Sequence, residues 1–550
     1  MKIRVSIEGI IKDVEENICF GELLSEEHKT RDVPIVLAKQ NNKYYELSSL
    51  VKESGEISFV DITEKIGMDT YKRTAQFIFI KAVLDLFSDA KINIEHSINK
   101  GIYGEIHKSS PLIEEELFLI KKRMDEIIAR DIKIEKKIVK KILAEEIFDI
   151  YGMDDKLRLL KYVKNDELEV YKLEDMYDYF YGEMAYSTGV LKNYDLLFYN
   201  PGFIIRFPRT KTPTKLPVFK EQKQLYSVFK ETANWLHILG VADVGALNNT
   251  KENHEIDEII RVSEALHEKK IAHIADKFCE KKDAKIILVA GPSSSGKTTF
   301  TKRLSIQLKV NGLKPVMISL DDYFVSRDKT PLDEEGKPDF ECLEALDLEL
   351  FNRNLRDLLN GKIVEIPSFN FKTGQREWIG NKISLEGDRV LLVEGIHGLN
   401  NRLTSTIDDK YKFKIYISAL TQLNLDNHNK ISTTDVRKIR RIVRDSLSRG
   451  YNAEKTLVMW PSIKRGEEKN VFIFQEEADI MFNSTLVYEL AVLKNLALEE
   501  LEKVDINSEV YYEAKRLKTF LDFFEDINLD NVPKNSILRE FVGGSCFYEY

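Results

Sequence analysis

An eight-residue segment carries the clearest chemical signal in the sequence. It occupies residues 291–298 and reads Gly-Pro-Ser-Ser-Ser-Gly-Lys-Thr. Backbone N–H groups of such a loop point at phosphate oxygens, and its glycines allow a tight turn and a close approach of the phosphate. Lys297 would reach the β- and γ-phosphates, and the Thr298 hydroxyl would bind Mg²⁺. The residues expected to hold a nucleoside triphosphate are Gly291, Ser293, Ser294, Ser295, Gly296, Lys297, Thr298 and Thr299.

The flanks of this segment have the secondary structure that a phosphate-binding loop requires. Residues 286–290 form a short apolar run, which is typical of a buried strand. In residues 299–308 the apolar side chains recur at helical spacing, which predicts a helix. The alternative, a serine-rich turn before an ordinary helix, fits these flanks less well.

Two carboxylates follow further apolar runs. Asp321 comes after the strand expected at 315–320, and Glu394 after the run at 390–393. The carboxyl ends of parallel strands meet at one sheet edge, where ligands of open α/β sheets bind. Asp321 is the candidate general base for a hydroxyl acceptor, and Glu394 is the candidate Mg²⁺ ligand, directly or through water. The alternative is that both are solvated acids at strand ends.

Arginines crowd the segment from 435 to 450. Arg437, Arg440, Arg441 and Arg444 recur at helical spacing, so several share one helix face. A basic face beside a triphosphate would neutralise phosphate charge and act as a closing lid. The alternative is a solvated charged face.

The bulk composition narrows the class of protein. The 550 residues suggest three or four domains, and 43% are hydrophobic, which supports ample core. The net charge of −9 disfavours a general nucleic-acid coat. The four cysteines are far apart, so neither a zinc site nor a disulfide framework is expected. No apolar run approaches a membrane span, and we expect a cytoplasmic protein without membrane contact.

Changes in pattern along the chain predict its domains. Strands alternate with helices between residues 284 and 503, which indicates a parallel α/β sheet flanked by helices. Before it we expect a small β-grasp unit, a mixed α+β region and a charged helical linker; after it, a helix and tail. The predicted ranges are 1–60, 61–250, 251–283, 284–503 and 504–550.

The segment 285–500 resembles the uridine kinase and phosphoribulokinase branch of phosphate-loop kinases. The matching pieces are residues 291–299, 321–324, 366–371, 393–395 and the arginine helix that ends at Arg449-Gly450. The resemblance implies that Asp321 takes the proton of a nucleoside 5′-hydroxyl. It implies that Lys297 and Thr298 handle ATP and Mg²⁺, and that Arg441, Arg444 and Arg449 close on phosphate.

The same resemblance indicates which residues contact the acceptor. Phe340-Glu341 stands where pyrimidine nucleoside kinases have a Phe-Asp pair at the ribose, and Gly374 stands where they have a base-reading histidine. The resemblance therefore does not fix the identity of the nucleoside, and a purine or modified nucleoside is an alternative to uridine. The substrate-binding residues expected are Asp321, Tyr323, Phe340, Glu341, Phe369 and Phe371.

The N-terminal half resembles two modules of threonyl-tRNA synthetase. These are the β-grasp TGS domain, over about 1–60, and the second additional, editing-like domain, whose resemblance is carried by residues 94–101. The layout looks like a group of bacterial nucleoside kinases. The synthetase has a second histidine where Lys100 follows His96, so no zinc or hydrolytic site is expected here. This half would bind RNA, bind a regulator or mediate assembly of a homo-oligomer.

The sequence thus predicts an ATP- and Mg²⁺-dependent kinase of a nucleoside 5′-hydroxyl. Two alternatives stay open. One is a kinase of another small alcohol or a sugar phosphate, as in phosphoribulokinases. The other is an RNA-binding regulatory protein that uses nucleotide hydrolysis as a switch.

Overall fold

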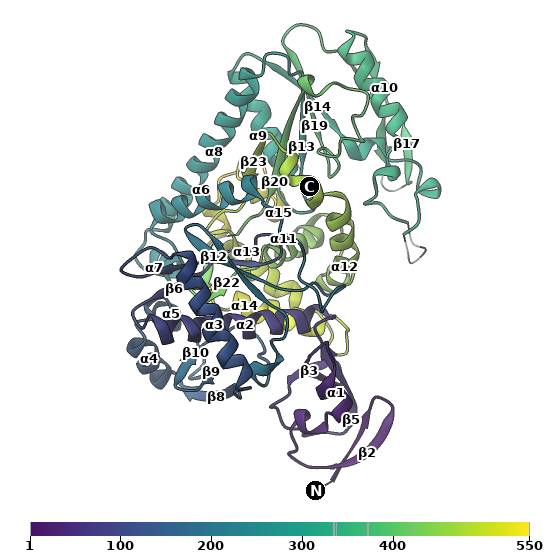
Figure 1. Cartoon of the computed structure of the whole chain (residues 1–550). Coiled ribbons are helices and arrows are strands. Elements are labelled where there is room, and N and C mark those ends of the chain that lie inside the picture. Colours follow the sequence, from purple (N-terminus) through teal and green to yellow (C-terminus); the bar gives the residue numbers. More distant parts are fainter. Residues whose placement is uncertain (1, 334–335, 337, 371–372, 422, 549–550) are drawn as a thin grey trace.

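Five strands near the N-terminus form a mixed sheet in the computed structural model, which describes residues 2–333, 336, 338–370, 373–421 and 423–548 (Figure 1). Strand β1 runs parallel to β5, and the other pairs are antiparallel, in the order β2-β1-β5-β3-β4. The strand-rich pattern expected over 1–60 is confirmed, whereas the TGS-like β-grasp assignment stays a prediction. The elements are β1 (Lys2–Ile7), β2 (Ile10–Glu15), α1 (Glu26–Thr30), β3 (Ile35–Gln40), β4 (Lys43–Glu46) and β5 (Gly55–Asp61).

Helix α2 (Lys65–Leu86) is the buried centre of the next region. Residues 77–80, Phe-Ile-Phe-Ile, are fully buried, because a helix that is apolar all round must be covered on every side. Two antiparallel sheets follow, in the orders β11-β12-β7-β6 and β10-β9-β8. The elements are β6 (Lys91–Ile94), β7 (Ile102–His107), α3 (Glu114–Ala129), β8 (Glu135–Lys140), α4 (Lys141–Ile150), α5 (Asp154–Leu160), β9 (Glu167–Leu173), β10 (Met176–Asp178), β11 (Asp195–Tyr199), β12 (Gly202–Arg206), α6 (Lys223–Leu239) and α7 (Val244–Glu252).

A parallel sheet organises the C-terminal half, as expected, and it has five strands. Its order is β14-β19-β13-β20-β23, and every residue of the central strand β13 is buried, which explains its unbroken apolar sequence. Helices flank the sheet (Figure 1). The elements are β13 (Ile286–Ala290), α9 (Lys297–Val310), β14 (Lys314–Ser319), α10 (Leu348–Leu359), β19 (Arg389–Glu394), β20 (Lys412–Ser418), α11 (Thr433–Ser448), α12 (Ala453–Asn470), β23 (Ile480–Asn483) and α13 (Glu489–Leu501).

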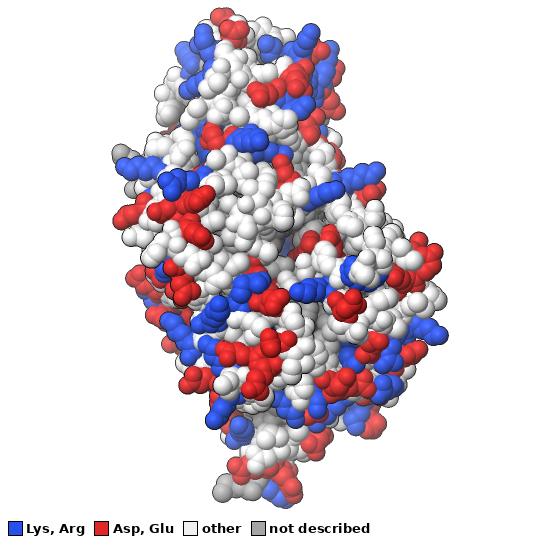
Figure 2. Space-filling model, turned by 90° about the vertical axis from the view of Figure 1, so that its left-hand side faces the viewer, with Lys and Arg blue, Asp and Glu red and all other residues white. Residues whose placement is uncertain are grey.

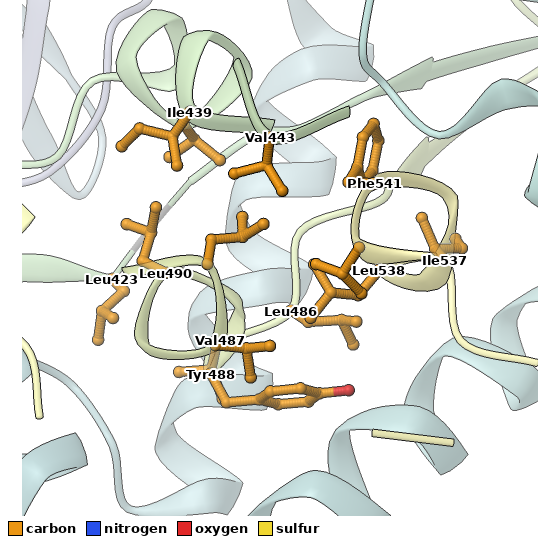
Figure 3. Packing of buried hydrophobic residues seen from close by; sticks show 14 of the residues in the cluster. Leu423, Ile439, Val443, Leu486, Val487, Tyr488, Leu490, Ile537, Leu538 and Phe541 are labelled. Carbon is orange, nitrogen blue, oxygen red and sulfur yellow. The ribbon is translucent and has the colours of Figure 1, made fainter. Parts of the chain in front are cut away.

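Two segments outside this sheet share its hydrophobic core. Helix α8 (Ile256–Glu280), within the expected linker, packs on α9 and buries Ile271, Ile274 and Phe278 in the same cluster as β13. The C-terminal helices α14 (Tyr511–Leu521) and α15 (Arg539–Val542) belong to that cluster as well. In Figure 3 Ile537, Leu538 and Phe541 of the C-terminal segment lie beside Val443 and Leu486. The exact domain boundaries stay predictions.

A buried ionic junction joins the second region to the C-terminal half. The Lys156 ammonium lies 2.8 Å from Asp426 and 3.2 Å from Asp178. His428 Nδ1 lies 2.7 Å from a carboxylate oxygen of Asp178. Charges this deeply buried must be paired to be tolerated, so the two halves hold each other's charges in place.

The surface carries both signs of charge. On the face shown in Figure 2, Lys and Arg side chains are interspersed with Asp and Glu side chains. Among the described residues, every helix is too short or too polar to span a lipid bilayer.

Candidate active site

The phosphate loop connects β13 to α9 at the carboxyl edge of the parallel sheet. A Cβ atom at Gly291 would lie 2.0 Å from the Ile417 carbonyl oxygen of β20, so only glycine fits there. Gly296 precedes α9 with φ +82°, in the left-handed region that favours glycine. The first N–H groups of α9 therefore face the loop, which makes its N-terminus an anion site.

Lys297 lies folded across the loop. Its ammonium donates to the carbonyl oxygens of Gly291, at 2.9 Å, and Pro292, at 3.0 Å. Burial lowers the pKa of Lys297, and the nearby carboxylates, Glu394 foremost, oppose that shift. A phosphate would be a stronger, charged acceptor for the same ammonium.

Thr298 and Glu394 form a pair of oxygen donors. The Thr298 hydroxyl lies 3.4 Å from each carboxylate oxygen of Glu394. Burial raises the pKa of Glu394 to about 7, against the opposing effect of Lys297. In the described ranges no group of three or more His, Cys, Asp or Glu gathers as a metal site. This pair fits Mg²⁺, which takes one or two protein oxygens and completes its shell with phosphate and water.

Asp321 lies next to Glu394 at the sheet edge. Strands β14 and β19 are neighbours with Ser319 opposite Glu394, and Asp321 follows in the short helix η3 (Leu320–Tyr323). The carboxylate is accessible to solvent yet surrounded by protein. This partial desolvation raises its pKa, and the charge of Lys297 works in the opposite direction. Asp321, Lys297 and Glu394 thus act on one another electrostatically.

Helix α11 runs along the phosphate loop. Arg437 donates to the Ser293 carbonyl at 2.9 Å, Arg441 to the Ser293 hydroxyl at 2.7 Å, and Arg440 to the Ser294 carbonyl at 3.3 Å. These arginines are at most 7% exposed, so the alternative of a solvated charged face is wrong. They instead fix the shape of the loop from outside.

Asp445 gathers the other arginines expected at the phosphates. It accepts from Arg441 at 3.0 Å and from Arg444 at 2.8 Å, and it lies 3.7 Å from Arg449. The Arg449 side chain is 51% exposed at the end of the helix. Of the three arginines, Arg441 contacts the loop directly, whereas Arg444 is held back by Asp445.

Glu341 is held beside the site by α12. A Cβ at Gly466 of that helix would lie 2.5 Å from the Cβ of Glu341, so the two backbones approach closely. Burial raises the pKa of Glu341 to about 7, and the charge of Glu467 adds to the shift. Arg441, Lys297 and Asp321 also act on Glu341, which places this acid at the same group as the expected base.

The expected acceptor side is built around Phe369 on β16 (Ser368–Asn370). Its N–H donates to Asp322 at 3.1 Å, and its ring meets Phe324 edge-on at 5.7 Å. Gly374 has φ +71°, and a Cβ there would lie 2.9 Å from the Cβ of Arg327, so a histidine would be strained. Phe371 lies outside the described residues.

Tyr323 and Phe340 are placed differently from this group. The Tyr323 ring is fully buried against Phe351, and its hydroxyl accepts from Asn354 at 3.0 Å. Tyr323 is thus a core residue in this structure, because its side chain turns from the strand end into the sheet. Phe340 is 44% exposed beside Glu341.

Two acids at the loop were not expected there. Arg437 and Arg440 were expected beside the triphosphate, but their individual contacts with the loop depend on the packing of α11. Glu467 accepts from the Ser293 N–H at 2.7 Å, and Glu540 accepts from the Thr299 N–H at 3.0 Å. These two acids lie 174 and 241 residues from their partners, and no local pattern marks them.

A parallel sheet with this loop, lysine and strand-end acids defines a phosphate-loop kinase. Residues 286–490 match the phosphoribulokinase / uridine kinase family. A uridine kinase of Macrococcus caseolyticus is 33% identical over 180 residues, which are 33% of this chain and 78% of that kinase. A uridine kinase of Staphylococcus aureus is 30% identical, over 33% of this chain and 77% of that kinase. The chain belongs to this family.

One solved structure is described as a "Possible Uridine Kinase from Bacillus stearothermophilus". It is 18% identical, with a TM-score of 0.26, over 39% of this chain and all of that one. A score this low supports no assignment by itself.

Proposed function

We propose that the chain transfers the γ-phosphoryl group of ATP to the 5′-hydroxyl of a nucleoside, with Mg²⁺. The observation that carries this proposal is the meeting of Asp321, Glu394 and Lys297 beside the phosphate loop, from adjacent strand ends. Phosphoryl transfer needs little covalent chemistry from the protein. Positioning and charge neutralisation, together with a base for the acceptor, supply most of the catalysis.

Each residue of the group has a separate task. Lys297 exchanges its loop carbonyls for phosphate oxygens and neutralises their charge. Thr298 and Glu394 would hold Mg²⁺, which would supply positive charge that neutralises the triphosphate. Asp321 accepts the proton of the 5′-hydroxyl as that oxygen attacks the γ-phosphorus, and ADP leaves on the opposite side.

The acceptor would be held by an acid and an aromatic ring. Ionised Glu341 accepts hydrogen bonds from two ribose hydroxyls, and Phe369 offers a face or edge to the base. Because Gly374 supplies no side chain, the base lacks the polar contact that a histidine would give. This arrangement recognises the sugar more strictly than the base.

The test measures ADP release with Mg-ATP and uridine, cytidine, adenosine, guanosine, inosine or thymidine. Asp321→Asn is compared with Asp322→Asn. We expect release that depends on a nucleoside and falls about 10³-fold in Asp321→Asn, with ATP binding retained. Normal turnover of Asp321→Asn would make another residue the base, with Asp322 the next to test.

ATP turnover that ignores every nucleoside would reject a nucleoside acceptor. A sugar phosphate or another small alcohol would then be tested in its place. Hydrolysis stimulated only by RNA would instead favour a regulatory NTPase, with the TGS-like and editing-like modules as its RNA-binding part.

A further inference from the structure

The C-terminal segment reaches the phosphate loop. Residues 536–548 lie outside the part of the chain that matches the kinase family, which ends at residue 490. They nevertheless contact two positions of the loop and its helix. Ile537 Cγ2 would lie 2.5 Å from a Cβ at Gly296, and Tyr548 and Glu540 both contact Thr299.

An apolar anchor holds this segment in place. Ile537, Leu538 and Phe541 are at most 1% exposed, and they pack with side chains of α11 and α13 (Figure 3). The Arg440 guanidinium lies over the Phe541 ring, 4.9 Å from its centre. Since Arg440 also contacts the loop at Ser294, the anchor and the loop are parts of one packed unit.

Glu540 projects from this anchor onto the start of α9. Its carboxylate accepts from the N–H of Thr299, the third residue of the helix, at 3.0 Å. That N–H is among those that no helical carbonyl satisfies and that bind anions at helix starts. Glu540 also acts electrostatically on Lys297 and Glu394. The Tyr548 hydroxyl lies 2.7 Å from the Thr299 hydroxyl, on the same residue.

We infer that Glu540 is a built-in competitor for the phosphates of the nucleotide. Its carboxylate occupies a helix-start amide that a bound triphosphate would use, and it must withdraw when the triphosphate binds. This inference rests on the proposed function, because it assigns a residue to the same ATP site.

The sign of the effect follows from charge. A phosphate and a carboxylate cannot share one N–H donor, and two anions at one helix start repel each other. The apolar anchor keeps the carboxylate close, so its local concentration stays high. Glu540 therefore lowers the affinity for ATP and favours release of a bound nucleotide.

The test compares wild type with Glu540→Gln and Glu540→Ala. The glutamine keeps the size and an oxygen acceptor but removes the charge, and the alanine removes the acceptor as well. Glu509→Gln, at an exposed position of the C-terminal region, is the matched control. Calorimetry would measure the dissociation constants of Mg-ATP and of inorganic triphosphate, which has no base.

We expect both Glu540 variants to bind Mg-ATP and triphosphate about tenfold more tightly, with no change in Glu509→Gln. Unchanged or weaker binding in both variants would overturn the inference and leave the proposed kinase intact. A gain for ATP without a gain for triphosphate would also overturn it, because the effect would then lie away from the phosphates. Failure of every protein, wild type included, to bind ATP would reject the proposed function itself.

Discussion

The phosphate loop and the surroundings of His96 differ in how they treat polar side chains. At the loop, lysine, arginines and acids from several elements meet, and Lys297, Arg441 and Glu467 each hydrogen-bond to a group of the loop. His96 is 4% exposed, stacks on Phe229 at 3.7 Å, and neither of its ring nitrogens has a hydrogen-bond partner among the described residues. The nearest carboxylate oxygen, from Glu95, lies 3.6 Å from Nδ1.

The phosphate loop has the properties of a ligand site, whereas His96 shows only that a sequence motif is present. The loop brings together polar side chains from distant segments and backbone N–H donors that suit phosphate groups. His96 lies in the segment predicted to be editing-like, but its ring packs against the rings of Tyr103 and Phe229. We therefore expect the residues at the loop to take part in the reaction and His96 to contribute only to packing. Four experiments test this difference.

Of these four experiments, Lys297→Ala should have the largest effect. Removing the ammonium leaves phosphate charge without neutralisation, so turnover with Mg-ATP should fall about 100-fold or more. Steady-state ADP release gives kcat, and Lys302→Ala on the same helix is the control. Turnover within threefold of wild type would remove Lys297 from the reaction.

Glu341→Gln should weaken the binding of the acceptor nucleoside rather than the binding of ATP. If Glu341 accepts from ribose hydroxyls, loss of its charge should raise the nucleoside KM about tenfold, with kcat nearly unchanged. Glu349→Gln, at an exposed position nearby, should change neither constant. An equal loss in kcat and kcat/KM would point instead to a role in the transition state.

The same substitution should change the pH dependence of stability without ligands. Burial raises the pKa of Glu341 from 4.5 to about 7 in the folded protein. The folded state therefore binds the proton more tightly, and stability falls as pH rises from about 4.5 to about 7. At pH 8 Glu341→Gln should be more stable by about 3 kcal/mol, and at pH 4.5 equally stable. Chemical denaturation at both pH values measures the free energy of unfolding of each protein. An equal difference between wild type and variant at the two pH values would contradict the prediction.

His96→Phe should have the smallest effect on activity, with turnover within about twofold of wild type because no reacting group touches it. Burial lowers the pKa of His96 well below 6.5, and the charge of Lys430 adds to this. The wild type should therefore lose stability as pH falls below about 6.5, and His96→Phe should lose less. Thermal unfolding at pH 5 and pH 7.5 measures this, with His107→Gln, at a 53% exposed side chain, as the control. A large loss of turnover would make His96 functional.

The sequence predicted those parts of the fold that depend on local pattern. Apolar runs marked four of the five strands of the parallel sheet, and glycine spacing marked the loop. The contacts of Glu467 and Glu540 were beyond such reasoning, because they depend on how distant segments pack. Tyr323 illustrates the same limit. A residue at a strand end can face the ligand or the core. Tyr323 faces the core, where its hydroxyl accepts a hydrogen bond from Asn354, which is 31 residues away in the sequence.

The packing of α8 and of the C-terminal helices decides how the protein can be dissected. A fragment trimmed to residues 286–490 would lack Ile271, Ile274 and Phe278 on one side and Leu517, Phe520 and Phe541 on another. Their apolar partners would then face water, and such a fragment is expected to aggregate. A recombinant fragment should therefore begin before Ile256 and retain the C-terminal helices. The unit that folds around the site is thus larger than the region that the family match covers.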